Sequence, residues 1–234
     1  MPLSRWCLSC RDRPNSGKDT NMPKLTLALY RVHIDPQGTA TVPALGASVI
    51  LAYDGALRVG DTALDTGEGT YIGGNAMLTN TSDAPAIALV FVLSDGPADG
   101  SALAHEVIDV TFPCLLRLDE VAFPPGVQAY RHVHAGSGFR HLRWGELRLE
   151  ADDHSFTATP GQTWFEPANT PVKATASTTE PETRFVRCMV VPVAYEGKPT
   201  IQILDPADAD RPKRQVTHRH VDQWLDGLPQ VDAG

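Results

Sequence analysis

Two histidines, His132 and His134, lie two residues apart in a short strand-like run, residues 128–134. Side chains two residues apart in a β-strand point to the same face, so both imidazoles and the ring of Tyr130 should share one face. Imidazole nitrogens about 7 Å apart along a strand can lean together and bind one divalent metal ion. The run therefore predicts a pocket-lining strand with two candidate metal ligands, and an aromatic side chain, Tyr130, that could contact a ligand.

The strands that would position these histidines are short and are separated by turn residues. Gly and Pro contribute 19 residues each and recur along the whole chain. No segment sustains helical periodicity over three turns, a short piece around 220–225 excepted. We therefore predict an all-β protein built as a barrel or a sandwich. The predicted strands are 25–34, 48–53, 56–59, 86–93, 128–134, 146–150, 155–158, 172–176 and 184–193.

A faint internal repeat suggests a duplicated barrel. Residues 55–59 (GALRV) match residues 145–149 (GELRL), and chance similarity of two hairpins is the alternative. The two matches are 90 residues apart, and at this offset Val42 and Ala44 take the places of the two histidines. The first barrel should therefore bind no metal. Residues 94–101 make the best linker. We expect a disordered segment at 1–21, barrels at 22–95 and 105–195, and a C-terminal tail at 196–234.

Composition excludes several classes of partner. A net charge of −8 and a pI near 5.4 argue against nucleic acid or an anionic membrane surface. No apolar run approaches the roughly 18 residues of a membrane span, and residues 1–21 lack the apolar stretch of a signal peptide. The protein could begin at Met1 or at Met22. The low cysteine count fits reduced thiols in the cytoplasm; the four are Cys7, Cys10, Cys114 and Cys188.

The histidine strand and its flanks resemble the cupin family. The first motif of that family is a glycine, five residues, H-x-H, three or four residues, a glutamate, six residues and a glycine. Four residues sit on this pattern: Gly126, His132, His134 and Gly145. Gly161 and Pro167 match the start of the second motif. The resemblance covers residues 120–192 and extends weakly to 25–93. It implies two double-stranded β-helix (jelly-roll) barrels in one chain, the first of them degenerate.

Two of the four ligands usual in that family are missing. Gly138 stands where the glutamate would fall, and Val172 stands where the second-motif histidine would fall. The glycine of the P-x-G in the second motif is replaced by Asn169. The resemblance therefore implies the barrel more firmly than it implies the metal site.

Two other residues could replace what is lost. Glu166 shares strand parity with Trp164 and could point inward, giving a two-histidine, one-carboxylate set that suits Fe²⁺, with Mn²⁺, Ni²⁺ or Zn²⁺ as alternatives. Arg140 lies two residues past the missing glutamate, so alternation turns it inward, where its guanidinium could hold a substrate carboxylate through two hydrogen bonds. A second arrangement stays open, in which Arg140 and Glu166 form an internal ion pair in a pocket without metal.

Two functions follow from these residues. The first is a metal-dependent, dioxygenase-type enzyme acting on a small organic or aromatic acid, with the metal on the histidines and Glu166, and with Arg140 and Tyr130 at the substrate. The second is a non-catalytic module that binds a small carboxylate through Arg140 and His134. A purely structural protein is a third reading, and fold alone does not choose among these. We expect a small-molecule ligand, a homodimer and a cytoplasmic location.

Overall fold

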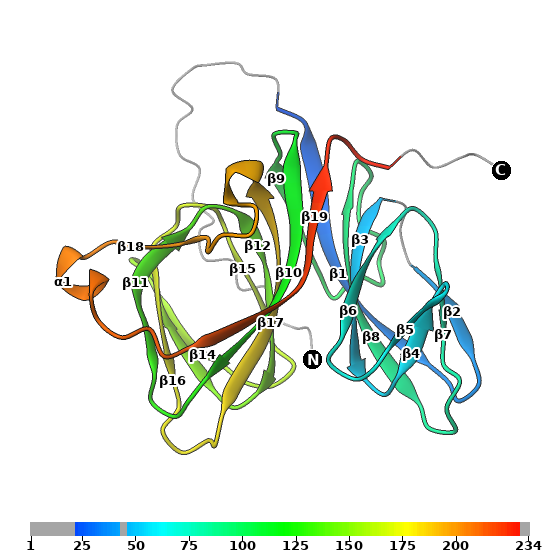
Figure 1. Cartoon of the computed structure of the whole chain (residues 1–234), viewed down its shortest axis with the longest axis horizontal. Helices are drawn as coiled ribbons and strands as arrows, with labels where there is room; N and C mark the ends of the chain where they lie inside the picture. The colour runs from blue at the N-terminus through cyan, green and yellow to red at the C-terminus, as the bar shows by residue number, and fades with distance from the viewer. Residues whose placement is uncertain (1–21, 43–45, 230–234) are drawn as a thin grey trace. The chain divides into compact units, whose positions relative to one another are not determined.

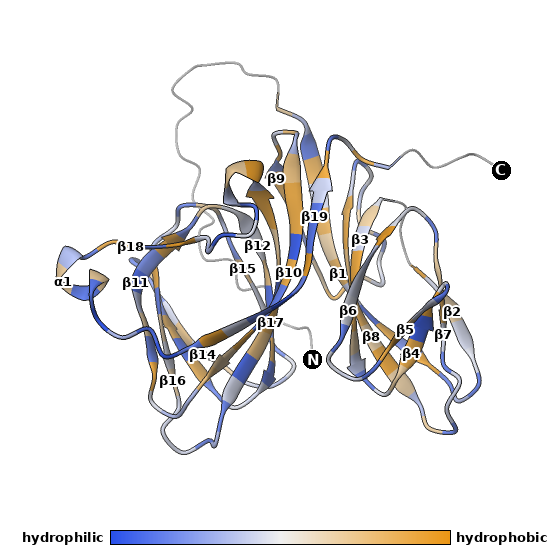
Figure 2. Ribbon diagram, in the orientation of Figure 1, coloured by the Kyte–Doolittle hydropathy of each residue, from blue (hydrophilic) through white to orange (hydrophobic). Residues whose placement is uncertain are grey.

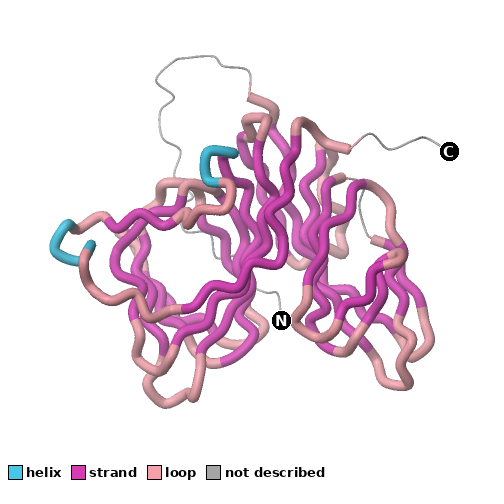
Figure 3. Tube along the Cα trace, in the orientation of Figure 1, coloured by secondary structure: helices cyan, strands magenta, loops and turns pink. Residues whose placement is uncertain are grey.

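The computed structural model of the protein describes residues 22–42 and 46–229, and the fold of these residues is almost entirely β (Figure 3). Their helical pieces are a 3-10 turn, Val193–Tyr195, and a four-residue helix, α1 (Pro206–Ala209). None of these described helices is long and apolar enough to cross a membrane. The chain separates into two compact units, each a barrel of paired antiparallel sheets. The predicted all-β, two-barrel fold is confirmed.

The C-terminal barrel comprises residues 119–219. Its two five-stranded sheets have the orders β15-β12-β17-β10-β19 and β14-β13-β16-β11-β18 (Figure 1). The strands are β10 (Cys114–Phe123), β11 (Gln128–His134), β12 (Ser137–Trp144), β13 (Leu147–Glu150), β14 (Ser155–Ala158), β15 (Thr163–Glu166), β16 (Val172–Ala176), β17 (Thr183–Pro192), β18 (Ile201–Ile203) and β19 (Val216–Leu225).

The N-terminal barrel comprises residues 22–118 together with 220–229 of the described chain. Its sheets have the orders β6-β3-β8-β1-β9 and β2-β7-β4-β5. Val42, which stands where the other barrel has His132, is buried in its apolar core, and Ala44 lies outside the described residues. The strands are β1 (Lys24–Ile34), β2 (Thr39–Thr41), β3 (Ala47–Asp54), β4 (Leu57–Val59), β5 (Thr62–Leu64), β6 (Gly69–Gly73), β7 (Met77–Thr79), β8 (Ala86–Ser94) and β9 (Ala104–Asp109).

The faint sequence repeat corresponds to the same turn in both barrels. Gly55 and Gly145 each precede the matching strand, and both have φ = 75°, a left-handed conformation that favours glycine. In the strands that follow, β4 and β13, the first and third residues are apolar and buried, and the arginine between them is exposed. The two repeats thus share the turn and the alternation of the strand, both of which are local properties.

The barrel boundaries differ from those expected. The two units divide inside β10, after Leu118, and inside β19, after Arg219. The predicted linker at 94–101 instead belongs to the connection between β8 and β9, and β9 pairs with β1 of the same barrel. Turn-forming residues mark a turn, but they do not say whether the chain then leaves the domain. Residues 1–21, with Cys7 and Cys10, lie outside the described residues.

The predicted C-terminal tail contains two strands that belong to the sheets. β18 pairs with the histidine-bearing strand β11, and β19 is an edge strand beside β10. The helix considered around 220–225 is wrong, because these residues belong to β19. The free edge of a sheet supplied hydrogen-bond partners that sequence periodicity does not reveal.

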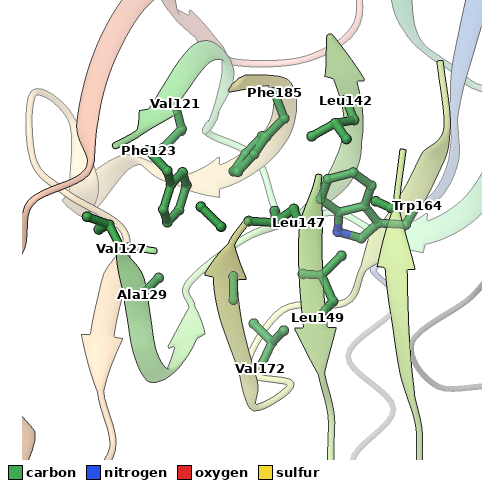
Figure 4. Close-up of a cluster of buried hydrophobic side chains, with 13 residues drawn as sticks. Val121, Phe123, Val127, Ala129, Leu142, Leu147, Leu149, Trp164, Val172 and Phe185 are labelled. Atoms are coloured by element: carbon green, nitrogen blue, oxygen red, sulfur yellow. The ribbon is translucent and has the colours of Figure 1, made fainter. Parts of the chain in front are cut away.

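Apolar side chains fill the C-terminal barrel between its sheets. Figure 2 shows apolar residues along the strands of each barrel and more polar residues in many connecting loops. Trp164 is only 1% exposed and meets Phe185 edge-on, with ring centroids 5.6 Å apart. Phe123 lies 6.0 Å from Phe185 by the same measure (Figure 4). Burying each such ring stabilises the fold by about 1.5–3 kcal/mol, which gives the site a rigid apolar base.

Candidate functional site

A cavity of about 140 Å³ lies inside the C-terminal barrel. One part of its wall is apolar and is formed by the core described above, with Trp164 and Phe185 among its members (Figure 4). The remaining wall carries polar and charged side chains from both sheets and from the C-terminal segment: His132, His134, Arg140, Glu166, Arg187, Thr200, Gln215, Thr217 and Arg219. The barrel therefore presents an apolar surface and a cluster of charges to one small space.

His132 and His134 meet as the sequence predicted. Their Nε2 atoms are 3.1 Å apart, and the two side chains are 4% and 6% exposed. The Nδ1 of His132 lies 2.6 Å from the carbonyl oxygen of Tyr130, so this nitrogen must carry a proton and donate. The Nδ1 of His134 lies 3.1 Å from the hydroxyl of Thr200, on the C-terminal segment.

These contacts form a complete chain of hydrogen bonds between neutral groups. Thr200 donates to His134, the Nε2–H of His134 donates to the Nε2 of His132, and His132 donates to the carbonyl of Tyr130. Burial lowers the pKa of His132, and it lowers the pKa of His134 well below the usual value, with Arg187 adding to the effect. Both imidazoles are therefore neutral near pH 7.

Arg140 and Glu166 form a buried ion pair. The Nη2 of Arg140 lies 2.9 Å from Oε2 of Glu166, and the side chains are 1% and 8% exposed. The other oxygen of Glu166 accepts from the indole N–H of Trp164 at 2.8 Å, and Nη1 of Arg140 donates to the carbonyl of Gly138 at 2.6 Å. Both oxygens of this carboxylate are thus already engaged within the protein.

A second ion-pair group stands beside the first. Arg187 donates to Asp119 from Nε and Nη2, at 3.2 and 2.9 Å, and Arg219 donates to the other oxygen of Asp119 at 3.0 Å. Arg187 lies directly opposite Arg140 in the pairing of β12 with β17. Like charges placed so closely repel each other unless each has its own counterion. Three guanidinium groups therefore line one cavity, where the carboxylates of Glu166 and Asp119 hold them in place.

The residues of this cavity do not fit a resident divalent metal ion. The 3.1 Å spacing of the Nε2 atoms would suit two neighbouring ligands, but within residues 22–42 and 46–229 no group of three His, Cys, Asp or Glu side chains could hold an ion. Glu166 is engaged by Arg140 and Trp164, and the surrounding guanidinium groups repel a cation.

At Gly138, where the family has its glutamate, backbone atoms of the neighbouring strand occupy the space that a side chain would need. A Cβ atom built on Gly138 would lie 2.0 Å from the carbonyl oxygen of Cys188 on the neighbouring strand, a distance that real Cβ atoms essentially never show. Any side chain at Gly138 would force β12 and β17 apart. The ligand cannot be regained here by substitution while the two strands keep this spacing.

Tyr130 is placed away from the cavity. The pairing of β11 with β16 shifts register between Ala129 and His132, so two residues rather than one separate these two inward-facing side chains. Such a bulge breaks the alternation that placed Tyr130 on the histidine face. Its ring instead lies beneath the guanidinium of Arg211, 5.0 Å from the ring centroid, and only its carbonyl contributes to the site.

Sequence reasoning missed Arg187, Gln215 and Arg219. Arg187 stands in the middle of the apolar run that forms β17, and a charge inside a buried strand is a usable sign of an ion pair or a site. Gln215 and Arg219 come from residues interpreted as a tail, where no local pattern indicates a barrel wall. The Oε1 atom of Gln215 is buried and has no hydrogen-bond partner among the residues that the structure describes.

Comparisons with known proteins agree with this fold. A sequence family described as a cupin domain matches residues 119–191. A mutant of the oxalate decarboxylase of Bacillus subtilis aligns with a TM-score of 0.61 and 10% identity, over 80% of this chain and 73% of that one. AerE from Microcystis aeruginosa aligns at 0.54 and 12%, over 72% and 93%. Procruciferin, an 11S globulin of Brassica napus, aligns at 0.54 and 10%, over 75% and 77%.

No curated protein matches this chain in sequence. At 10–12% identity the solved structures show the fold alone, and their names describe quite different proteins. Function must therefore be argued from the residues of the cavity.

Proposed function

This chain belongs to the cupin superfamily, and we propose that its C-terminal barrel binds a small organic acid in the cavity without the help of a resident metal ion. The observation that carries the proposal is the gathering of three guanidinium groups, those of Arg140, Arg187 and Arg219, on the cavity wall beside apolar side chains. These guanidinium groups would attract an anion at low dielectric, whereas they would repel a divalent cation.

In addition to the arginines, the two histidines can donate a hydrogen bond to an anion. Because both imidazoles are neutral, they offer one N–H that can be redirected from the His132–His134 hydrogen bond to a ligand oxygen. The hydroxyl of Thr200 keeps donating to the Nδ1 of His134 in that event, which holds the proton of this imidazole on Nε2. The pair therefore serves as an adaptable donor and need not act as a metal ligand.

A metal-dependent enzyme remains the second candidate, because the two Nε2 atoms converge on one point. The proteins of this fold include enzymes, and a divalent ion held by the histidines would supply a Lewis acid. On that reading Glu166 would have to leave Arg140. The homodimer and the cytoplasmic location expected from the sequence stay predictions and belong to either candidate.

Metal content and acid binding distinguish the two candidates. The full chain, purified without chelator or a polyhistidine tag, is measured by elemental analysis beside His132→Ala. We expect both to hold far less than one ion per chain. In EDTA, ligand-observed NMR with a panel of small carboxylates should show binding that Arg187→Met weakens. Arg148→Met is the matched control, since Arg148 is an exposed arginine of the same barrel.

Two results would overturn the proposal. One is a stoichiometric divalent ion that disappears in His132→Ala. The other is the failure of every carboxylate in the panel to bind the metal-free protein, since the charge argument requires an anion in this cavity.

A further inference from the structure

We infer that the ligand of this cavity is an organic acid that carries a neutral hydrogen-bond donor, such as a hydroxyl, at the end opposite its carboxylate. Gln215 accepts a hydrogen bond from that donor and selects for it. This inference rests on the proposed function, and it narrows the ligand from organic acids in general to hydroxylated ones.

Gln215 supplies an acceptor that the protein leaves open. The residue lines the cavity, its Oε1 atom is buried, and this oxygen accepts no hydrogen bond from any residue that the structure describes. A buried acceptor without a donor is destabilising, so such an atom at a binding site indicates a donor that arrives with the ligand. Glu166 on the same wall differs, because Arg140 and Trp164 already engage both of its oxygens. Gln215 thus offers a ligand an acceptor that Glu166 does not offer.

The guanidinium groups of the cavity lie in one row across the sheet β15-β12-β17-β10-β19. Arg140 of β12 stands opposite Arg187 of β17. Arg187 and Arg219 both donate to Asp119 of β10, the strand between β17 and β19. A carboxylate that binds these guanidinium groups therefore lies at the level of this row.

Gln215 lies at another level of the barrel, as the direction of β19 shows. Asp119 of β10 contacts Arg219 of β19. Earlier on β10, Arg117 contacts Asp222, which comes later on β19, so the two strands are antiparallel. Gln215 comes before Arg219 in the chain, and it therefore lies toward the C-terminal end of β10.

Apolar side chains lie between these two levels. Phe123 ends β10 and lies beside Phe185 of β17, with ring centroids 6.0 Å apart. Phe185 and Val121 both line the cavity. Because an extended chain rises about 3.3 Å per residue, the α-carbons of Gln215 and Arg219 are roughly 13 Å apart. A ligand that reaches from the guanidinium row to Gln215 therefore carries its carboxylate and its donor at opposite ends of an apolar body.

Two pairs of acids test for the donor, and the members of each pair differ by a hydroxyl in place of a methyl group. A cavity of about 150 Å³ takes a molecule of the size of benzene, and this cavity measures about 140 Å³. One pair is therefore para-hydroxybenzoate and para-methylbenzoate, and the other is γ-hydroxybutyrate and pentanoate. Dissociation constants are measured by isothermal titration calorimetry and NMR on the full chain in EDTA.

We expect the hydroxylated member of at least one pair to bind about fivefold or more tightly than its methyl partner, because a methyl group would leave the buried oxygen of Gln215 without a donor. An ether oxygen accepts hydrogen bonds but does not donate them. For this reason para-methoxybenzoate should bind no more tightly than para-methylbenzoate.

A variant of Gln215 tests the assigned acceptor. Gln215→Met keeps the length of the side chain and removes the oxygen, so the ratio of the two dissociation constants within a pair should fall to about one. Gln202→Met is the matched control and should leave the ratio unchanged, since Gln202 is an exposed glutamine of β18 outside the cavity wall. The ratio is the readout because a loss of folded protein changes both affinities alike.

The outcomes distinguish this inference from the proposed function. The inference is supported by a hydroxyl preference that Gln215→Met abolishes and Gln202→Met retains. Methyl acids that bind as tightly as their hydroxylated partners, a preference unchanged in Gln215→Met, or para-methoxybenzoate binding as tightly as para-hydroxybenzoate would overturn the inference and leave organic-acid binding standing. Absence of binding by every acid would overturn both.

Discussion

Replacing Glu166 by glutamine tests whether this carboxylate serves the fold or a metal. Gln keeps the shape of the side chain and an oxygen that can accept from Trp164, but it removes the negative charge 2.9 Å from Arg140. Burial lowers the pKa of Arg140 to about 10, and Glu166 acts in the opposite direction. Leaving a buried cation without its partner costs about 3–5 kcal/mol, so Glu166→Gln should lower the free energy of unfolding by that amount.

A matched exposed pair supplies the control. Glu182 lies 2.7 Å from Arg184, with the two side chains 41% and 31% exposed, and exposed pairs contribute about 0–1 kcal/mol. Glu182→Gln should therefore cost less than about 1 kcal/mol. Both variants are measured by urea unfolding in EDTA, followed by tryptophan fluorescence. Arg140→Met combined with Glu166→Gln should recover most of the loss, because it removes both buried charges.

The result that would refute this reasoning is specific. If Glu166→Gln is as stable as wild type in EDTA, and loses bound metal that the wild type retains, then the carboxylate is a metal ligand and the ion pair is incidental. A double variant no more stable than the single one would show that the cost comes from packing rather than from charge.

Three further predictions concern the same barrel. Gly138→Ala should lower the free energy of unfolding by more than about 1–3 kcal/mol, the usual cost of overpacking, because its Cβ would meet the carbonyl oxygen of Cys188. The measurement is the melting temperature, and an unchanged value would contradict the close spacing of β12 and β17. The lowered pKa values of His132 and His134 mean that the unfolded chain binds more protons below about pH 6.5, so stability should fall with decreasing pH by up to about 1.4 kcal/mol per unit for each histidine, and His134→Gln should reduce the slope. Burial raises the pKa of Cys114 to about 11 and raises that of Cys188 further, so peptide mapping should find neither thiol alkylated by iodoacetamide at pH 8 in the folded protein.

Local rules explain what the sequence predicted correctly. Short runs of β-forming residues between Gly and Pro turns predicted the all-β fold, and the bounds of β11, β14 and β16 agree to the residue. Alternation along a strand predicted that His132, His134, Arg140 and Glu166 would share one interior, and all four line the cavity. It also left open the ion pair between Arg140 and Glu166, which the structure contains.

Alternation failed where the backbone itself departs from the ideal strand. The bulge in β11 turned Tyr130 away from the cavity, and a register shift of this kind depends on the strand opposite. The closing of the space at Gly138 likewise depends on the distance to Cys188 on another strand. Neither effect is encoded within a few residues of the position it changes.

By itself, the sequence determined the strands, the face of the two histidines and the loss of two family ligands. Only the tertiary structure decided the chemistry of the cavity, because that chemistry depends on charges brought together from distant parts of the chain. Asp119, Arg187 and Arg219 meet across 100 residues of sequence, and the last of them comes from a segment with no local sign of its role. Long-range ion pairing thus gathers the guanidinium groups on which the proposed anion site depends, although a two-histidine strand alone suggests a metal.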